Sequence, residues 1–504
     1  MVTMKKAKIL MISPNMRGLD DGVNRIQPSL GLMLIASVLL KAGHEVKILD
    51  TALEGWNNRR LIDPIKRKLV IGQSDEEIAK AISNFSPDIV AITVLFSNFL
   101  AASHDVARIA KKVNKNIKVV LGGNHITNAV LDYGFSFDKK SNLPNYIEDL
   151  EDENIDFAMV GEGEKPMLQL VEAIINDGDL SKVPGLVKRI GKKKYLINRK
   201  NEKHAMDLLP QPARHLVDME SYFKIGAFQS AKSRSKRVLT VQCSRGCPEK
   251  CTFCTTPQQW GSSVRWRSTK HIMEEINTDV KRYNIGEIQF QDDTLTLHKQ
   301  HLFSLCKELE KVGLPWCTPN GTKANYHLKD QQNMYNAMAG SGCYQITIAC
   351  ESGSQRVLDE LIDKRLPLET IYPAIAKAKK AGMLVHTYWI LGYPGETYEE
   401  IQKTVDFAYN SGADSFSFSN LQPLPGTPIY RKVMKENLWW PNRSLNDMLL
   451  RSSLIKVDGF NSPEEFEKFT DEVNRKGNLM LKEKDPARFK LKYGANDSSI
   501  VHQV

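Results

Sequence analysis

The stretch "CSRGCPEKCTFC", from Cys243 to Cys254, holds four of the chain's eight cysteines. Four thiolates can close a metal site completely, as in structural zinc or an iron–sulfur electron carrier. Three thiolates can instead hold a metal centre that keeps one position open, while the fourth thiol stands aside. Which arrangement holds decides whether this region stabilises the fold, passes electrons or performs chemistry.

The spacing of these cysteines disfavours structural zinc. A tetrahedral zinc site usually combines two close C-x2-C pairs that lie far apart in the chain. The cysteines outside the stretch form no such pair and stand alone, at Cys306, Cys317, Cys343 and Cys350. A closed ferredoxin-type cluster is still possible with Cys243 as the fourth ligand. Cys243 ends an expected strand, however, whereas the other three fall within one loop, so we expect three thiolates and an exposed iron.

Length and composition indicate a multidomain globular protein without a membrane span. The chain has 504 residues, enough for about three domains, with 41% hydrophobic and 25% charged residues. Its longest mostly apolar stretch, Leu30 to Leu40, is about half of what a bilayer requires. The N-terminal sequence lacks a signal-peptide cleavage site. Clustered cysteines indicate a metal in a reducing cytosol, so we expect a cytoplasmic protein.

The excess of basic residues is mild and does not predict nucleic-acid binding. The net charge is +10, and much of it comes from residues 188–203 and 230–237. The first of these segments alternates like a solvated hairpin that turns at Gly191. Tyr195 is the one aromatic residue among its charges, whereas a platform for single-stranded nucleic acid needs several. We therefore expect no nucleic-acid partner.

The amino-terminal part alternates β-branched runs with amphipathic segments, which predicts parallel strands joined by helices. Strands are expected at residues 8–13, 45–50, 88–93, 118–123 and 156–164, and helices at about 28–43, 75–84, 100–113 and 166–176. The pattern indicates a doubly wound, Rossmann-like domain over residues 1–180. Ligands of such sheets bind beyond the carboxyl ends of the strands.

A second α/β unit is expected after a hairpin and linker at residues 181–236. Strands are predicted from Val238, Glu287, Tyr344 and Val385, with helices near 268–283, 298–312, 355–362 and 368–381. This unit, residues 237–430, is a partial or full (β/α) barrel whose reactive residues lie where strands end. Residues 431–504 are expected to form a small helical region with an unstructured tail from Gly494.

An ordered set of motifs resembles one known family. "CPEKCTFC" has the C-x3-C-x-aromatic-C form of the radical S-adenosylmethionine (SAM) enzymes, and its surroundings resemble their cobalamin-binding branch. The resemblance covers about residues 5 to 430. It includes, in order, "PSLGL", "LGGNH", "VGEGE", "SRGCPEKCTFC", "WGSSVRWRS", "QDDTLT", "ACESGSQRVL", "LGYPGET" and "PLPGTPIY".

The resemblance implies a 4Fe–4S cluster held by Cys247, Cys251 and Cys254. The open iron would chelate the amino and carboxylate groups of SAM. One electron from the cluster then splits a carbon–sulfur bond and yields methionine and a 5′-deoxyadenosyl radical. The protein must orient the reactants and exclude water. Cys243 has no ligand role in this interpretation and is expected to be a small buried residue.

Further SAM contacts are implied by position within the motifs. Phe253 would pack on the adenine, or is a core aromatic residue. The strand end "QDD" would meet the methionine amine, or cap the next helix. A later strand end would face the ribose and methionine. Gly392 would contact adenine, although its motif lacks the usual first glycine. The residues of the "QDD" strand end are Gln291, Asp292 and Asp293. The residues of the later strand end are Glu351 and Ser352.

Two arginines after the cysteine loop have open roles at this stage. Arg265 and Arg267 either clamp a carboxylate or tie the loop to the barrel.

The amino-terminal domain is expected to bind cobalamin. It lacks G-x-G-x-x-G after its first strand, which removes the main support for a dinucleotide. Its glycine loops resemble those around the corrin in relatives, because glycine lets backbone approach a flat ligand. The D-x-H-x-x-G motif is absent, so cobalt would lack that histidine ligand. The implied cobalamin contacts are Ser13, Thr93, Gly122, Gly123, Asn124, His125, Gly161, Glu162 and Gly163.

The family implies methyl transfer to an unactivated carbon. One SAM methylates cobalt, a second yields the radical, and the substrate radical takes the methyl group. An alternative keeps both cofactors but performs oxidative cyclisation or rearrangement. RNA methylthiolation is set aside, because it predicts cysteines in the first domain and residues 1–242 contain none. The non-enzyme alternative is an electron carrier using all four clustered cysteines.

The substrate and partners follow less directly from the sequence. A small molecule or lipid is expected between the two domains, near Tyr388, Trp389 and Asn320, of which Tyr388 and Asn320 are candidate catalytic residues. The "QPLPGTP" loop at 422–428 would line this space, and Trp439 and Trp440 would cover it or belong to the core. An external electron donor of the flavodoxin or ferredoxin type is implied.

Overall fold

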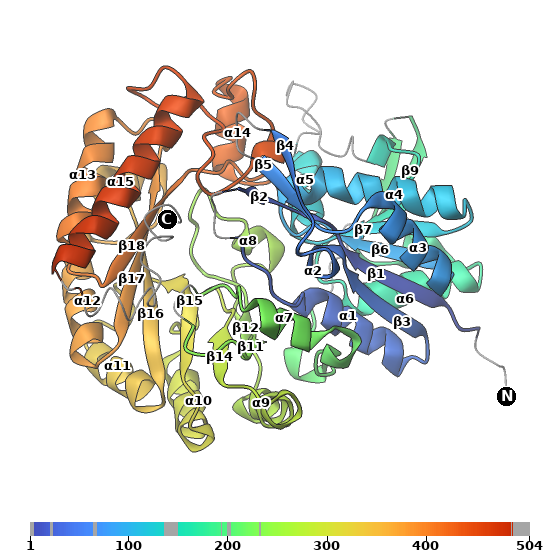
Figure 1. The fold of residues 1–504 in the computed structure, drawn as a ribbon, viewed down its shortest axis with the longest axis horizontal. Coiled ribbons are helices and arrows are strands. Elements are labelled where there is room, and N and C mark those ends of the chain that lie inside the picture. Colours follow the sequence, from blue (N-terminus) through green and yellow to red (C-terminus); the bar gives the residue numbers. More distant parts are fainter. Residues whose placement is uncertain are drawn as a thin grey trace.

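The protein consists of two α/β units that lie side by side (Figure 1). The computed structural model describes residues 5–20, 24–63, 68–135, 150–192, 194–198, 203–230, 233–484 and 486. A doubly wound amino-terminal sheet is followed by a second parallel sheet with outer helices, as the sequence predicts. The tail expected from Gly494 lies outside the described residues. Within those residues, no helix has the length and apolarity that a membrane span requires.

The first unit is built on a seven-stranded sheet with the order β10-β9-β8-β7-β6-β1-β3. Neighbours from β3 to β8 pair in parallel, and β9 and β10 continue the sheet in antiparallel fashion. The predicted hairpin therefore belongs to this sheet. The strands are β1 (Lys8–Ser13), β3 (Glu45–Asp50), β6 (Ile89–Thr93), β7 (Lys118–Gly122), β8 (Phe157–Met159), β9 (Leu186–Gly191) and β10 (Lys194–Ile197).

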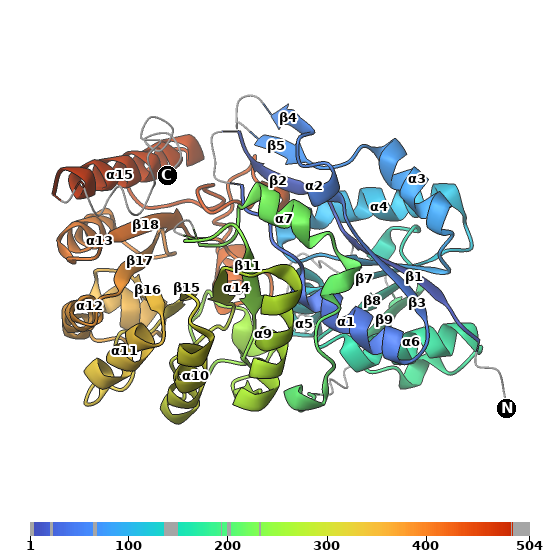
Figure 2. The same cartoon turned by 60° about the horizontal axis from the view of Figure 1, so that its bottom comes forward.

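Helices cover both faces of this sheet (Figure 2). Apolar residues of α3, α4 and α5 pack with one face, and those of α1 and α6 pack with the other. The central strands are buried on both sides, which explains why β1 and β6 are almost wholly apolar. The helices are α1 (Leu30–Lys41), α2 (Thr51–Glu54), α3 (Asp75–Phe85), α4 (Leu100–Val113), α5 (Asn124–Phe135) and α6 (Glu164–Ile175).

A small antiparallel sheet, which the sequence analysis missed, lies beside the first unit. Its order is β2-β5-β4, and it consists of β2 (Met16–Leu19), β4 (Arg59–Asp63) and β5 (Lys68–Ile71). The Lys68 ammonium, only 6% exposed, pairs with Asp447 from the carboxyl-terminal region. The small sheet thereby links the first unit to the far end of the chain.

The second unit is an open barrel of six parallel strands in the order β11-β14-β15-β16-β17-β18. Of the partial and full barrels that the sequence allowed, the structure contains the partial one. The strands are β11 (Val238–Val241), β14 (Glu287–Phe290), β15 (Trp316–Thr322), β16 (Cys343–Glu351), β17 (Leu384–Leu391) and β18 (Ser415–Asn420), and a separate short ladder joins β12 (Ser244–Arg245) to β13 (Arg265–Trp266).

Helices line the outside of the barrel (Figure 2). Residues 357–361 form a π-helical turn where a helix was expected. The last helix, α15, covers the edge strand β18, because Asn474 bonds both the backbone N–H and the carbonyl of Phe418. The helices of this unit are α9 (Thr269–Tyr283), α10 (Lys299–Val312), α11 (Gln331–Gly340), α12 (Ile371–Lys380), α13 (Tyr398–Asn410), α14 (Pro428–Lys435) and α15 (Pro463–Lys484).

The two faces of the barrel strands differ in chemistry. Along β17, Val385 and Trp389 pack into the core beneath the helices. Since side chains alternate along a strand, His386 and Tyr388 lie on the opposite, inner face. The His386 ring bonds the hydroxyl of Ser417 on the neighbouring strand. The inner wall of the barrel is therefore polar, and its outer wall is apolar.

The connector at residues 203–236 is built into both units. Arg214 is 1% exposed and pairs with Glu275 and Asp279 of α9. Tyr222, in α7 (Met219–Ile225), donates a 2.7 Å hydrogen bond to Asp50 of the first sheet. Further along, Ser230 N–H donates to the carboxamide of Gln289 on the inner barrel wall. This segment is thus a structural part of the interface.

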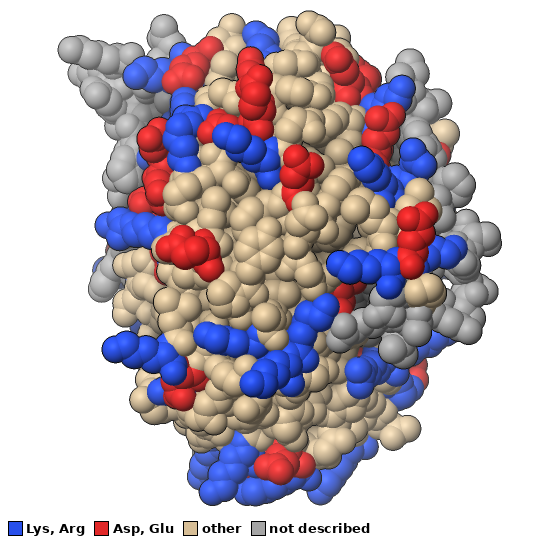
Figure 3. All heavy atoms as spheres, turned by 90° about the vertical axis from the view of Figure 1, so that its left-hand side faces the viewer, with Lys and Arg blue, Asp and Glu red and all other residues tan. Residues whose placement is uncertain are grey.

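Charges of both signs are mixed on the barrel face that carries α12, α13 and α15. Figure 3 shows basic and acidic side chains around a largely uncharged centre. Tyr372 and Tyr398, which are 41% and 39% exposed, contribute aromatic surface to these helices. Neither sign of charge dominates this face.

Candidate functional site

The cysteine loop lies at the carboxyl end of the barrel, between β12 and the short helix α8 (Thr256–Gln259). Thr252 N–H donates to the carbonyl of Ile362 at 2.8 Å, which ties the loop to the turn after β16. Glu249 accepts hydrogen bonds from Lys323 at 2.8 Å and from Tyr326 at 2.9 Å. The loop is therefore held in place on both sides by barrel residues.

Three thiols of this loop are close enough to influence one another electrostatically. Burial is the main cause that raises the pKa of Cys247 to about 11 and that of Cys251 to about 12, and the neighbouring Cys254 contributes to both rises. Burial also raises the pKa of Cys254. Buried thiols of this kind ionise only beside a positive partner, and cluster iron supplies one. The three residues therefore fit the predicted 4Fe–4S cluster.

Cys243 lies apart from these three. Its side chain is fully buried in the barrel core, whereas Cys251 belongs to a different apolar cluster. Burial raises the pKa of the Cys243 thiol well above its usual value, and the next contribution comes from Asp292. This placement supports the prediction that Cys243 is a small core residue.

The two acids after β14 have different surroundings. Asp292 is 1% exposed and accepts hydrogen bonds from Cys243 N–H, at 3.0 Å, and from the Ser244 hydroxyl, at 2.5 Å. Its carboxylate thus fastens β12 to β14, so a contact with the methionine amine finds no support. Asp293 accepts a 3.2 Å bond from Thr256 and acts electrostatically on Cys247 and Cys254. Asp293 therefore faces the cysteine loop.

Gln291, which precedes these two acids, has a side-chain N–H group that is available for a hydrogen bond. Its backbone N–H donates to the carbonyl of Val241. Its buried side-chain Nε2 donates to no described residue. Gln291 thus stays a candidate for a polar contact with cofactor or substrate.

A buried ion pair, which the sequence analysis missed, lies beside the cysteine loop. Lys364 Nζ is 2.9 Å from Glu351 Oε1, and each side chain is 8% exposed. Lys364 acts electrostatically on Cys251 and Cys254 and favours their charged forms. Glu351 has a φ of +67°, a strained value for this residue type. Lys364 lies just after the π-helical turn at Val357–Leu361, and no sequence pattern links it to Glu351.

Ser352, predicted beside Glu351 as a SAM contact, points elsewhere. Its hydroxyl lies 3.1 Å from that of Thr404 in α13 and also accepts from Ser354 N–H. The hydroxyl therefore serves the packing of α13 rather than a ligand.

Gly392 also has a packing role. Its φ is +86°, and a Cβ there would lie 2.9 Å from atoms of Phe466 and Val457 in the carboxyl-terminal region. Because Gly392 has no side chain, Phe466 and Val457 can pack against its backbone. An adenine contact through this position therefore finds no support. Phe253 is partly buried, and its ring centroid lies 6.1 Å from that of Tyr393. The structure leaves Phe253 between the two roles that the sequence allowed.

The rim of the first sheet contains a tight crossing of two loops. Gly123 has a φ of +100°, and a Cβ there would lie 2.8 Å from the carbonyl of Val94. His125 N–H donates to the same carbonyl, and its Nδ1 lies 2.8 Å from the hydroxyl of Ser97. Thr93 flanks this crossing. Glycine is therefore needed at residue 123 for the loop path.

The other glycines and Ser13 have varied positions at this rim. The Ser13 carbonyl accepts a hydrogen bond from Thr51 at 3.1 Å, and Gly161 N–H donates to Thr127 at the same distance. A Cβ at Gly163 would lie 2.9 Å from Ile35 of α1, so this glycine allows close helix packing. A Cβ at Gly122 would have its nearest neighbour, the carbonyl oxygen of Met159, at 3.9 Å, so this position has room for a side chain.

Buried amide oxygens beneath this rim fit a corrin ligand. Asn128 Oδ1, on α5, and Gln258 Oε1, on α8, accept no hydrogen bond from any described residue. A corrin carries several carboxamide groups whose N–H bonds can satisfy such acceptors. Asn124, at the start of α5, accepts a hydrogen bond from Gln259 of α8. The helix that follows the cysteine loop thus touches the predicted cobalamin rim.

Glu162 has a different environment from the one predicted. It is 2% exposed and pairs with Arg245, at 2.9 Å, and with Arg265 of the barrel. Glu164 pairs with the same Arg245 at 2.5 Å. Trp260 stacks on the Arg245 guanidinium, with 4.8 Å to the ring centroid. The carboxylate of Glu162 therefore joins the two units, and the role of Arg265 is to tie them together.

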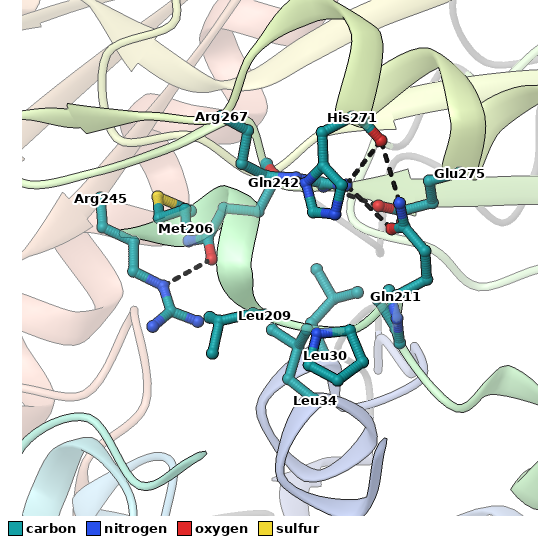
Figure 4. Close-up of a pocket in the computed structure, with 12 residues that line it drawn as sticks. Leu30, Leu34, Met206, Leu209, Gln211, Gln242, Arg245, Arg267, His271 and Glu275 are labelled. Carbon is teal, nitrogen blue, oxygen red and sulfur yellow. Dashed lines mark hydrogen bonds and ion pairs between the residues drawn. The ribbon is translucent and has the colours of Figure 1, made fainter. Parts of the chain in front are cut away.

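Arg267 contributes to the same interface from inside the barrel unit. It pairs with Glu275 at 2.6 Å and donates to Gln211 of the connector at 3.0 Å. Figure 4 shows it beside a cavity lined on the opposite side by Leu30 and Leu34 of α1. The cavity measures about 20 Å³, room for about one water. It belongs to the packed interface and has no cysteine in its lining.

The two candidate catalytic residues lie together on the inner barrel wall. Tyr388 OH donates to the carbonyl of Pro319 at 3.4 Å. The neighbouring Asn320 accepts from Gln229 at 2.7 Å and donates to the carbonyl of Asp292 at 3.1 Å. The hydrogen bonds connect Asn320 to the strand end that precedes Asp293.

The fold and these residues define a class of protein in which a ligand-binding doubly wound domain faces an open barrel with three clustered thiols. The sequence matches the radical SAM superfamily over residues 241–408 and the B12 binding domain over residues 19–134. Cytidylyl-2-hydroxyethylphosphonate methyltransferase of Streptomyces wedmorensis is 33% identical, over 94% of this chain and 90% of that protein.

Two further relatives complete the comparison. The anaerobic magnesium-protoporphyrin IX monomethyl ester cyclase of Rubrivivax gelatinosus is 26% identical, over 84% of this chain and 70% of that protein. The solved structure of OxsB, a cobalamin-dependent SAM radical enzyme, superimposes with a TM-score of 0.69 at 15% identity, over 99% of this chain and 72% of that chain. The latter likeness concerns the fold alone.

The chain belongs to the cobalamin-binding radical SAM enzymes. It is a methyltransferase of this family, and its cofactors are a 4Fe–4S cluster, SAM and cobalamin. The predicted family, activity and cofactors are thereby confirmed.

Proposed function

We propose that the protein methylates an unactivated carbon of a small molecule bound between the barrel mouth and the first domain. The observation that carries this proposal is the contact between Gln259, just after the cysteine loop, and Asn124 at the rim of the first sheet. It brings the two cofactor-binding regions to one place. When bound, the cofactors supply the electron, the methyl group and the radical.

The residues of this chain bind and orient the reactants. Cys247, Cys251 and Cys254 hold the cluster. Asp293 accepts a hydrogen bond from the methionine ammonium of SAM, and Lys364 attracts its carboxylate, because both charges lie beside the thiols. Phe253 supports the adenine.

The inner wall favours a polar substrate over a lipid. Asn320 and Tyr388 project from it with hydrogen-bonding groups, and Gln291 keeps a buried N–H available. The relative from Streptomyces wedmorensis is named for a polar phosphonate, which agrees with this choice. Tyr388 and Asn320 position the carbon that loses hydrogen.

Product analysis tests the proposal. Reconstituted enzyme, reduced by dithionite or by a flavodoxin, is incubated anaerobically with methyl-labelled SAM and candidate polar metabolites. We expect S-adenosylhomocysteine and 5′-deoxyadenosine together with a labelled product, and no turnover by Cys247→Ala. 5′-Deoxyadenosine without S-adenosylhomocysteine would contradict methyl transfer and select oxidative cyclisation, the activity named for the Rubrivivax relative. Faster turnover with flavodoxin than with dithionite would support an external protein donor.

A further inference from the structure

Arg25 is a charged residue of the first unit that reaches the barrel. It lies in the segment between β2 and α1, where Ile26 N–H donates to the carbonyl of Ala227 at 2.8 Å. The Arg25 guanidinium donates to the carbonyl of Phe228, also at 2.8 Å. Ile26 itself belongs to the apolar core of the barrel. This segment is thus anchored on the connector that follows the inner barrel wall.

Within the described part of the chain, no acid compensates the charge of Arg25. Desolvation lowers the pKa of the guanidinium, and the phenol of Tyr388 is the group whose charge would offset this effect. Among the described residues, no carboxylate pairs with Arg25. Buried arginines of this protein elsewhere have acidic partners, as Arg214 and Arg245 do. A desolvated guanidinium that lacks a carboxylate partner is costly, so proteins rarely keep one without a use.

The position of Arg25 coincides with the candidate substrate residues. Phe228, whose carbonyl it bonds, precedes Gln229, which donates to Asn320 at 2.7 Å. Tyr388 acts electrostatically on Arg25. Its hydroxyl donates a hydrogen bond to the carbonyl of Pro319, the residue before Asn320. Three separate elements, the segment before α1, β15 and β17, therefore converge here. Glu351, the acid that acts on Tyr388, is itself neutralised by Lys364.

We propose that Arg25 binds an anionic group of the substrate, a phosphate, phosphonate or carboxylate, at the mouth of the barrel. This inference rests on the proposed function and adds the substrate class to it. Guanidinium presents parallel N–H donors that match the oxygens of such groups. The anion supplies the negative charge that no described carboxylate provides beside Arg25. Its binding fixes the neutral part of the substrate beside Tyr388 and Asn320.

The test is anion binding to the holoenzyme, loaded with cluster, cobalamin and SAM. Isothermal titration uses 2-hydroxyethylphosphonate, inorganic phosphate and acetate, with ethylene glycol as the uncharged probe. Variants are Arg25→Met, Arg25→Lys and the control Arg475→Met, at an exposed position of α15. We expect saturable binding of at least one anion, a loss of about tenfold or more in Arg25→Met, a smaller loss in Arg25→Lys, and none in the control.

Two further measurements separate this role from others. Without added anion, the melting temperature of Arg25→Met should stay close to that of the wild type, because removal of an uncompensated charge offsets the lost bond to the Phe228 carbonyl. Cleavage of SAM to 5′-deoxyadenosine without substrate should be unchanged, which shows that the cofactor sites are intact. Equal anion affinity in Arg25→Met, no anion binding by the wild type, or weakened binding of SAM or cobalamin would each overturn the inference. Failure of SAM cleavage in the wild type would instead overturn the proposed function.

Discussion

Two loops meet where the units of this protein face each other, and they use their reactive side chains differently. The cysteine loop holds three thiols that influence one another and face Asp293 and Lys364. The acidic loop at residues 161–164 instead commits Glu162 and Glu164 to barrel arginines. Sequence motifs predicted cofactor binding for both loops. The cysteine spacing can be recognised within one short stretch of sequence. The role of Glu162 or Glu164 depends instead on an arginine of the other unit, which the local sequence does not show.

Replacing the thiols gives the largest expected effect. Each of Cys247→Ala, Cys251→Ala and Cys254→Ala should lose most of its bound iron after anaerobic reconstitution and all SAM cleavage, because a three-ligand site cannot hold a cluster with two. Cys243→Ala is the matched control and should keep its iron. Iron and sulfide analysis with electron paramagnetic resonance makes the measurement. Iron loss in Cys243→Ala would show that four cysteines ligate the cluster and would remove the contrast within this loop.

The acidic loop is tested by Arg245→Met. This change leaves Glu162 and Glu164 buried without their shared partner, and should lower the free energy of unfolding by about 3–5 kcal/mol. Denaturant unfolding provides the measurement. Arg265→Met, whose side chain is 18% exposed, should cost less. If both variants keep wild-type stability but lose cobalamin, the carboxylates act on the cofactor and the two loops are alike after all.

A third comparison separates adjacent acids. Asp293→Asn should weaken SAM binding by about tenfold, since one charge-assisted hydrogen bond is lost, with little change in melting temperature. Asp292→Asn should show the reverse pattern, because Asp292 accepts bonds from Cys243 N–H and Ser244. Equilibrium dialysis of SAM and thermal melting report the two quantities. Identical behaviour of the two variants would contradict the separate roles.

The last prediction concerns the pH dependence of stability and rests on Glu396, whose carboxylate accepts from the N–H groups of Gly392 and Tyr393. Burial raises its pKa from 4.5 to about 8. The folded protein therefore keeps a proton that the unfolded chain loses, and stability falls as pH rises from about 4.5 to about 8. The slope is at most about 1.4 kcal/mol per pH unit. Glu396→Gln should flatten the change in unfolding free energy between pH 6 and 8. An unchanged slope would assign the titration to another group.

The sequence predicted the parallel strands of the first sheet because their apolar runs are continuous and their connecting helices are amphipathic. It missed β15, whose residues Pro319 and Gly321 interrupt the strand pattern and accompany a register shift. It also missed β18, although "SFSFSN" alternates clearly between phenylalanine and serine. The strands of the small sheet are only four or five residues long, too short for a period to show.

The candidate site divides in a similar way. The cysteines were predictable because their ligand spacing lies within one loop. Glu162, Ser352 and Gly392 are engaged by Arg245, Thr404 and Phe466, which are distant in the chain. No local pattern shows such a partner. Lys364 was missed for the same reason, since its importance appears only when the fold places it beside Glu351 and Cys251.

Residues 233–236 of the connector limit where the two units can be separated. Arg234 N–H and Ser235 N–H both bond the carboxylate of Glu287, and Ser233 bonds Gln289, so the barrel interior is finished by residues that precede its first strand. A barrel truncated at residue 237 would open these groups to water and lose its lining. Any separation of the two units would therefore have to keep residues 233–236 with the barrel that they complete.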